Sequence, residues 1–180
     1  MQARIRAFGF GQKKIKGAKV LVLIDWENLL AALRLLSSPP ERFSMAAGFD
    51  RLIEEITDKV GEIAVVFIFT PSHLVASVEQ ISRELGFFTV VCPKTKDKKT
   101  GEYVDTVDAT LIELGEIQMG LINGLTHLCI GSGDRDFTPL MRRARRKGLR
   151  TIVVAGSEKS LASKMIDLAD NLFIFSPSID

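Results

Sequence analysis

Short apolar runs alternate with longer amphipathic stretches along most of this chain. Continuous apolar strands rich in Val and Ile, separated by amphipathic helices, are typical of a parallel sheet covered on both faces. Strands are expected at residues 20–24, 63–69, 87–91, 126–130 and 151–154, with a short sixth strand at 172–175. Helices are expected near residues 29–36, 49–59, 74–85, 106–119, 137–147 and 160–168.

This alternation predicts a three-layer α/β/α domain with a central, mainly parallel sheet of five or six strands. The expected core order of the strands is 3-2-1-4-5, as in doubly wound folds. With 180 residues, of which 46% are hydrophobic, the chain is long enough for one well-buried core and short for two. We therefore predict a basic N-terminal extension at residues 1–18 and one domain at residues 19–180.

The composition argues against secretion and against membrane insertion. The basic amino terminus is followed by no apolar signal-like segment, and the longest apolar runs have the length of strands. The two cysteines, Cys92 and Cys129, make no disulfide framework and lack the spacing of metal ligands. A reducing, cytoplasmic location is predicted.

Basic residues are unevenly distributed, although the net charge is only +2. One cluster lies in the N-terminal extension, a second in an apparent loop before residue 101, and a third in the helix after residue 137. A single cluster is usually a solvated surface, but three of them beside one acidic edge favour nucleic acid, whose phosphates bind basic groups in a sequence-independent way. The predicted backbone contacts are Lys94, Lys96, Lys98, Lys99, Arg142 and Arg146.

Aspartates follow two of the predicted strands within a few residues. Asp25 ends the strand at 20–24, and Asp134 and Asp136 follow the strand at 126–130. The order 3-2-1-4-5 makes these strands neighbours, so their carboxylates meet at the carboxyl edge of the sheet, where open α/β folds bind ligands. Carboxylate oxygens suit Mg²⁺ or Mn²⁺. Asp105 and Asp108, at the start of a predicted helix, are both candidates for a further ligand.

Helix capping is the ordinary explanation for each of these acids taken alone. An Asp before a helix, or in its first turn, stabilises that helix without any further role. Asp134 and Asp136 together would repel each other unless a cation or a basic neighbour lies between them. Arg135 is one such neighbour, so capping stays open as an alternative.

Three segments occur in the order found in NYN domains: Leu-Ile-Asp-Trp-Glu-Asn at 23–28, Val-Asp-Ala-Thr-Leu at 107–111, and Gly-Ser-Gly-Asp-Arg-Asp-Phe at 131–137. The chain resembles in particular the bacterial LabA-like group within the PIN-like nuclease superfamily. The resemblance extends from about residue 19 to residue 175. It departs from the common pattern at Arg135, where a small Ser is frequent.

The resemblance implies a PIN-like, Rossmann-like fold and a metal-dependent ribonuclease. Carried over position by position, it makes Asp25, Asp108, Asp134 and Asp136 the metal ligands. Asn28 and Ser132 complete the implied catalytic set by orienting a water or a phosphate oxygen.

The predicted function is hydrolysis of RNA phosphodiester bonds by a protein that uses Mg²⁺ or Mn²⁺ at the carboxyl edge of the sheet. The alternative is a non-catalytic regulatory module of LabA-like type that binds RNA, a nucleotide or a protein. RNA is the expected partner and no membrane is expected. A homodimer or a protein partner is left open, because the apolar segment 29–33 suits either a core or a dimer face.

Overall fold

The computed structural model describes residues 14–34 and 43–179, and its centre is a six-stranded sheet. The strands lie in the order β4-β3-β1-β7-β8-β9, and all five neighbouring pairs are parallel. Numbered along the chain, this is the predicted order 3-2-1-4-5 with a sixth strand added at the edge. The six strands are β1 (Lys19–Asp25), β3 (Glu62–Pro71), β4 (Phe88–Cys92), β7 (His127–Gly131), β8 (Arg150–Ala155) and β9 (Asn171–Ile174).

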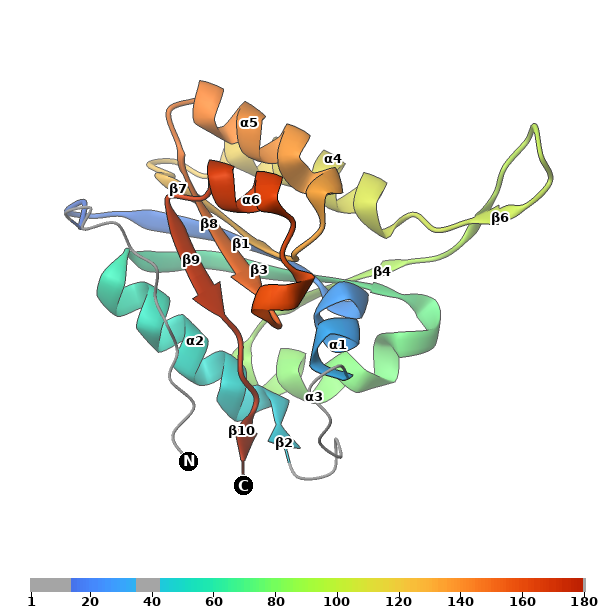
Figure 1. Cartoon of the computed structure of the whole chain (residues 1–180), viewed down its shortest axis with the longest axis horizontal. Helices are drawn as coiled ribbons and strands as arrows, with labels where there is room; N and C mark the ends of the chain where they lie inside the picture. The colour runs from blue at the N-terminus through green and yellow to red at the C-terminus, as the bar shows by residue number, and fades with distance from the viewer. Residues whose placement is uncertain (1–13, 35–42, 180) are drawn as a thin grey trace.

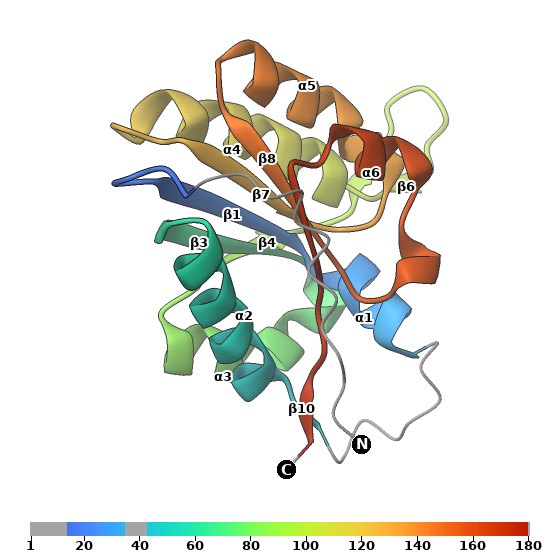
Figure 2. The same ribbon diagram turned by 60° about the vertical axis from the view of Figure 1, so that its left-hand side comes forward.

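Helices cover both faces of the sheet, as Figures 1 and 2 show. One face carries α1 (Trp26–Arg34), α2 (Met45–Lys59) and α3 (Val75–Leu85). The other carries α4 (Val107–Leu121), α5 (Thr138–Arg146) and α6 (Ser163–Leu168). The predicted three-layer α/β/α architecture is confirmed. Short 3-10 turns precede three of the helices: η2 (Ser72–Leu74), η3 (Arg135–Phe137) and η4 (Glu158–Ser160).

Strand β1 lies in the middle of the sheet and contributes to a core on each face. Val20, Val22 and Ile24 belong to the cluster under α1, α2 and α3. Leu21 and Leu23 point the other way, into the cluster under α4, α5 and α6. All five are 2% exposed or less. Burying each such side chain stabilises the fold by about 1.5–3 kcal/mol, which explains why the strand is apolar throughout.

Several predicted boundaries are displaced. Helix α1 begins at Trp26, directly after β1, and α2 begins at Met45, where the Ser44 side chain accepts a hydrogen bond from the Ala47 amide. The helix predicted from residue 137 is divided into η3 and α5, and the one predicted from residue 160 begins at Ser163. Residues 1–13 of the predicted extension and the predicted end of the first helix at 35–36 lie outside the described residues.

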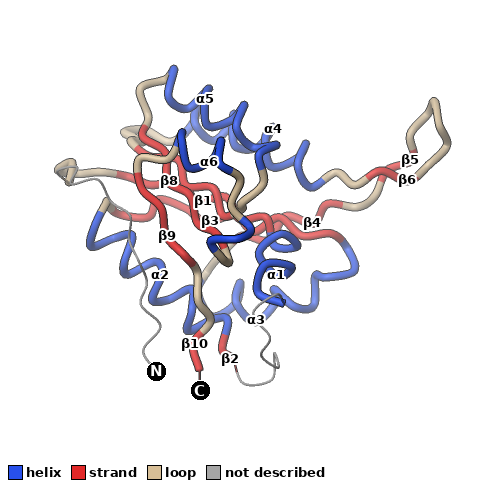
Figure 3. Tube along the Cα trace, in the orientation of Figure 1, coloured by secondary structure: helices blue, strands red, loops and turns tan. Residues whose placement is uncertain are grey.

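Two small ladders were not predicted. β2 (Phe43–Ser44) pairs antiparallel with β10 (Ser178–Ile179). The lysine-rich segment expected to be a loop is a hairpin of β5 (Thr95–Lys96) and β6 (Tyr103–Val104), which projects beyond β4 and α4 in Figure 3. Within residues 14–34 and 43–179, no helix is long and apolar enough to cross a membrane.

Candidate functional site

The predicted acidic edge is built where β1 and β7 end side by side. Ile24 pairs with Gly131 in the parallel register, so Asp25 and Ser132 follow at the same level. The chain leaves β1 into α1 and leaves β7 through residues 132–134 into η3. This is the topological switch point of the sheet, because the crossovers from β1 and β7 go to opposite faces.

A chain of hydrogen bonds joins these two strand ends. The Asn28 amide donates to Asp25 Oδ1 at 3.2 Å, and Ser132 Oγ donates to Asp25 Oδ2 at 3.4 Å. The Asp134 amide in turn donates to Ser132 Oγ at 3.2 Å, and the Gly133 amide donates to Asn28 Oδ1 at 3.2 Å. Both oxygens of Asp25 are therefore oriented by the protein, one from each strand end.

Gly133 permits this close approach. A Cβ atom at this position would lie 2.1 Å from the carbonyl oxygen of Ser160, a distance that no side chain tolerates. The Gly133 carbonyl also accepts a hydrogen bond from the Ala162 amide at 3.0 Å. The loop after β7 is thus held between α1 and the segment before α6.

Asp25 is a buried carboxyl group, only 6% exposed. Its burial raises its pKa from an ordinary 3.8 to about 7, and the negative charges of Asp108 and Asp134 act in the same direction. The hydrogen bonds from the Asn28 amide and from Ser132 oppose the shift without cancelling it. No Lys, Arg or His in the described part of the chain forms an ion pair with Asp25. Its negative charge therefore lacks a protein counter-charge there.

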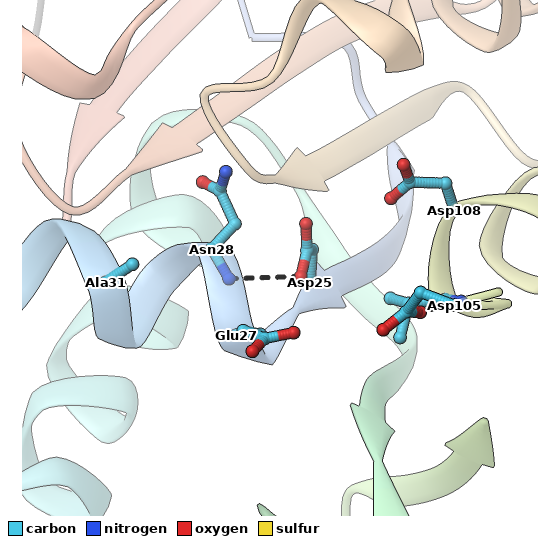
Figure 4. A pocket seen from close by; sticks show the side chains of 7 residues that line it. Asp25, Glu27, Asn28, Ala31, Asp105 and Asp108 are labelled. Carbon is cyan, nitrogen blue, oxygen red and sulfur yellow. Dashed lines mark hydrogen bonds between the residues drawn. The ribbon is translucent and has the colours of Figure 1, made fainter. Parts of the chain in front are cut away.

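The acids at the start of α4 face Asp25 across a cleft of about 400 Å³. In Figure 4 the carboxylates of Asp108, in the first turn of α4, and of Asp105, just before that helix, lie on the side of the cleft opposite Asp25. Burial and the charges of Asp134, Asp136 and Asp105 raise the pKa of Asp108. The Asp105 side chain instead accepts a hydrogen bond from the Val107 amide at 2.8 Å. The cleft is lined by Asp25, Glu27, Asn28, Ala31, Asp105, Val107 and Asp108.

Electrostatics and hydrogen bonding distinguish the two candidates. The charge of Asp108 raises the pKa of Asp25. Asp105, which precedes α4, already uses its carboxylate to accept from the Val107 amide. Asp108 is therefore the better placed of the two to act together with Asp25.

Asp134 and Asp136 stand beside this cleft rather than in its lining. The Asp134 side chain accepts a hydrogen bond from the Asp136 amide at 3.0 Å and so caps η3. The Asp136 side chain is 65% exposed and lies 3.9 Å from Arg135. The capping role considered for this pair is present, and both carboxylates still act on Asp108 through their charge.

Asn28 and Ser132 have contacts that define their part in the site. The Ser132 hydroxyl is fully buried, donates to the Asp25 carboxylate and accepts from the Asp134 backbone amide, so it holds the Asp25 side chain and the loop after β7 in place. Asn28 lines the cleft, with its Oδ1 bonded to Gly133. Its Nδ2 donates to no acceptor within the described residues and is free to reach a ligand.

The donor set fits a hydrated divalent cation. In residues 14–34 and 43–179, no three His, Cys, Asp or Glu side chains lie close enough to ligate one ion. A closed cage of protein ligands is therefore absent from this part of the chain. Mg²⁺, however, is usually bound through one or two carboxylates and keeps several waters. The cleft offers oxygen donors, an excess of negative charge and a buried carboxylate that pairs with no basic residue in the described ranges. These features suit such an ion.

The predicted basic residues divide into two groups. Lys94, Lys96, Lys98 and Lys99 are all exposed on the β5–β6 hairpin, which joins β4 to α4 at the same edge as the acids. Arg142 and Arg146 are exposed on α5, which runs away from that edge. Because nine helical residues span about 13 Å, Arg146 lies at the far end of the helix from η3. The structure does not bring Arg146 together with the acids.

Two aromatic residues next to the acids have different surroundings. Trp26 is 1% exposed, packs 6.2 Å from Phe49 between ring centroids and donates to Ser77, so it belongs to the core. Tyr103, which the sequence did not single out, is 71% exposed on β6. An aromatic residue between charged residues in a polar loop was the signal that could have identified it.

Comparisons with known proteins agree with this architecture. The family model of the NYN domain matches residues 19–177, nearly the whole chain. A crystal structure of a protein of unknown function from Vibrio parahaemolyticus is similar, with a TM-score of 0.67 and 18% sequence identity. The similarity covers 92% of this chain and 97% of that one and supports the fold. No curated protein sequence matches significantly. The chain belongs to the NYN domain family, which has a PIN-like nuclease fold.

Proposed function

We propose that this protein is a divalent-metal-dependent ribonuclease whose active site is the cleft between α1 and the start of α4. The observation that carries the proposal is Asp25, a buried carboxylate that faces other carboxylates and has no basic partner in the described residues. Such an arrangement is costly unless a cation compensates it. The NYN family adds the expectation that the substrate is RNA.

Each acidic residue has a distinct part in this proposal. Asp25 and Asp108 would hold the ion directly, because they face each other across the cleft. Asp134 and Asp136, beside the cleft, would accept hydrogen bonds from waters bound to the ion and would add negative charge near Asp108. The Asn28 amide donates to one oxygen of Asp25 and the Ser132 hydroxyl donates to the other, so the carboxylate is held in one orientation.

The chemistry is hydrolysis by water rather than by a protein nucleophile. A bound Mg²⁺ or Mn²⁺ would lower the pKa of a water and offset the charge on the phosphate. The Nδ2 group of Asn28, a residue that lines the cleft, would donate a hydrogen bond to a phosphate oxygen. The exposed lysines of the hairpin would hold the flanking RNA backbone.

The experiment compares cleavage of a mixed pool of single-stranded and structured RNA in Mn²⁺, Mg²⁺ or EDTA. Wild-type protein should cleave with either metal, and Asp25→Asn or Asp108→Asn should lower the rate at least ~100-fold, the scale for losing one group that stabilises charge in a transition state. Asp50→Asn, at an exposed position on α2, is the matched control. Equal rates in EDTA, or full activity in Asp108→Asn, would contradict the proposal.

A non-catalytic regulatory module, as the LabA-like resemblance implies, is the second candidate. It is favoured by one observation, that no three potential metal ligands are preassembled in the described residues. Folded wild-type protein that binds Mn²⁺ or RNA without cleaving any member of the pool would select this candidate.

A further inference from the structure

The hairpin formed by residues 94–104, here called the lysine hairpin, projects from the body of the protein beyond β4 and the start of α4 (Figures 1 and 3). It begins after β4 has ended at the carboxyl edge of the sheet, and it returns to Asp105, a residue that lines the cleft. Its base is closed by Thr106, whose hydroxyl donates to the Pro93 carbonyl at 2.9 Å. The hairpin is therefore fixed at the edge of the site.

The turn of the lysine hairpin is built by Asp97. Its carboxylate accepts hydrogen bonds from the Lys99 amide at 2.7 Å and from the Thr100 amide at 2.8 Å, which lowers its pKa. Gly101 follows with a φ of 73°, a conformation that other residues rarely adopt. These contacts give the turn one defined conformation, so the lysines around it are presented in a fixed arrangement.

Lys96 and Tyr103 are paired directly across the two strands. Residues paired in this way lie on the same face of a hairpin, and the next pairs on either side lie on the opposite face. Thr95 and Val104 form one of these next pairs. The other is Asp97 and Glu102, joined by a backbone hydrogen bond of 2.8 Å. The strand alternation thus puts Lys96 and Tyr103 on one face of the hairpin and Asp97 and Glu102 on the opposite face.

Neither member of this pair is used by the fold. Tyr103 is 71% exposed, and within the described residues Lys96 forms no ion pair. The ring of a tyrosine offers an apolar face on which any base stacks, and an adjacent lysine can contact the phosphate of the same nucleotide. A flat aromatic face and a neighbouring cation are the elements of binding sites for unpaired nucleic acid.

We infer that the lysine hairpin is a binding arm for single-stranded RNA, with Tyr103 stacking on an unpaired base and Lys96 contacting the adjacent phosphate. This inference rests on the proposed function, for which it names the substrate class. In a duplex, both faces of a base are stacked on adjacent bases, so the Tyr103 ring selects unpaired RNA over duplex. Tyr103 lies two residues before Asp105, about 7 Å along an extended chain, so the stacked base is close to the cleft.

The test measures binding without cleavage, using a fluorescent single-stranded RNA of mixed sequence and its duplex, both in EDTA. Tyr103→Ala should weaken binding of the single strand roughly 5- to 150-fold, the range reported for removal of one stacked aromatic. Tyr103→Phe should restore most of the affinity, and duplex binding should change little. Val104→Ala, on the opposite face, is the matched control, since Val104 is also exposed. A single-stranded DNA of the same sequence tests whether the sugar contributes.

Tyr103 is the only tyrosine in the sequence, which gives a direct readout of stacking. In protein labelled with fluorotyrosine, the single fluorine resonance should shift when single-stranded RNA is added. Lys96→Ala should reduce the salt dependence of binding by about one phosphate contact, a slope change of roughly 0.7. If Tyr103→Ala binds single-stranded RNA as tightly as wild type, the inference is overturned. It is also overturned if this variant changes its oligomeric state while its RNA affinity stays the same.

The two proposals fail in different ways. If Tyr103 governs binding in EDTA but wild-type protein cleaves no RNA with Mn²⁺, the arm is supported and the ribonuclease is not. If cleavage depends on Asp25 and Asp108 while Tyr103→Ala binds single strands as tightly as wild type, the ribonuclease is supported and the arm is not.

Discussion

Replacing Asp25 by Asn should stabilise the protein at neutral and alkaline pH, although it removes a proposed metal ligand. The folded state raises the pKa of Asp25 from 3.8 to about 7, mainly because the group is buried. Between about pH 4 and pH 7, the Asp25 carboxyl is mostly protonated in the folded protein and mostly ionised in the unfolded chain. The free energy of unfolding therefore falls as pH rises from about 4 to about 7, and it stays low above that range.

The magnitude follows from the size of the shift. A change of about three pKa units corresponds to a cost of about 4 kcal/mol for the charged form at pH 8. Asparagine has the same shape and no charge, and its amide can still accept from Asn28 and bond to Ser132. Allowing about 1 kcal/mol for a less favourable hydrogen bond, Asp25→Asn should be more stable than wild type by ~3 kcal/mol at pH 8.

The assay is urea denaturation of both proteins in EDTA at several values between pH 5 and pH 8. The stability gap should widen by ~2.5 kcal/mol over this range, because the slope for one proton is ~1.4 kcal/mol per pH unit until the pKa of about 7 is approached. Asp50→Asn, on the surface of α2, should show no such change. A gap between Asp25→Asn and wild type that is the same at pH 5 and pH 8 would refute the reasoning.

Two further predictions concern the same edge of the sheet. Mn²⁺ should raise the melting temperature of wild type more at pH 8 than at pH 6, because at pH 6 binding must displace the proton from Asp25. Calorimetry of Mn²⁺ binding at pH 6, in two buffers of different ionisation enthalpy, should detect proton release from wild type and none from Asp25→Asn. Gly133→Ala should cost ~1–3 kcal/mol in urea denaturation, because its Cβ would meet the Ser160 carbonyl at 2.1 Å. Gly120→Ala, in α4 with nothing within 4 Å of its Cβ, should be neutral or stabilising, and equal losses in both variants would refute the steric explanation.

The strand order was predictable because the central strands differ so clearly from the rest of the chain. Residues 20–24 are apolar throughout and residues 128–130 continue the pattern, as strands covered on both faces require, and an acid and a helix come after each run. The exact helix starts were not predictable in the same way. Asp134 and Ser157 begin 3-10 turns through side-chain contacts with amides two and three residues on, and these contacts depend on loop geometry.

The lysine hairpin could not be predicted from the pattern of apolar and polar residues. Its strands have two residues each, too short to display an alternation of apolar and polar positions. What makes the segment a hairpin is the pair of hydrogen bonds to Asp97, the positive φ of Gly101 and the contact between Thr106 and Pro93 at its base. The sequence identified the lysines, while their placement opposite Tyr103 needed the register of the ladder.

The acidic cleft and the lysine hairpin should have opposite effects on RNA, which would separate binding from the proposed hydrolysis. Without a cation, the carboxylates at the cleft repel phosphates, whereas the exposed lysines of the hairpin attract them at any metal concentration. RNA binding in EDTA should therefore depend on salt through basic residues such as the hairpin lysines and not through the cleft. Metal would add attraction at the cleft, where Asp25 lacks a counter-charge within the described residues. On the proposed function, a hairpin that binds RNA before the metal site is filled would keep the strand close to the cleft, and the ion would then decide whether the phosphate can approach the acids.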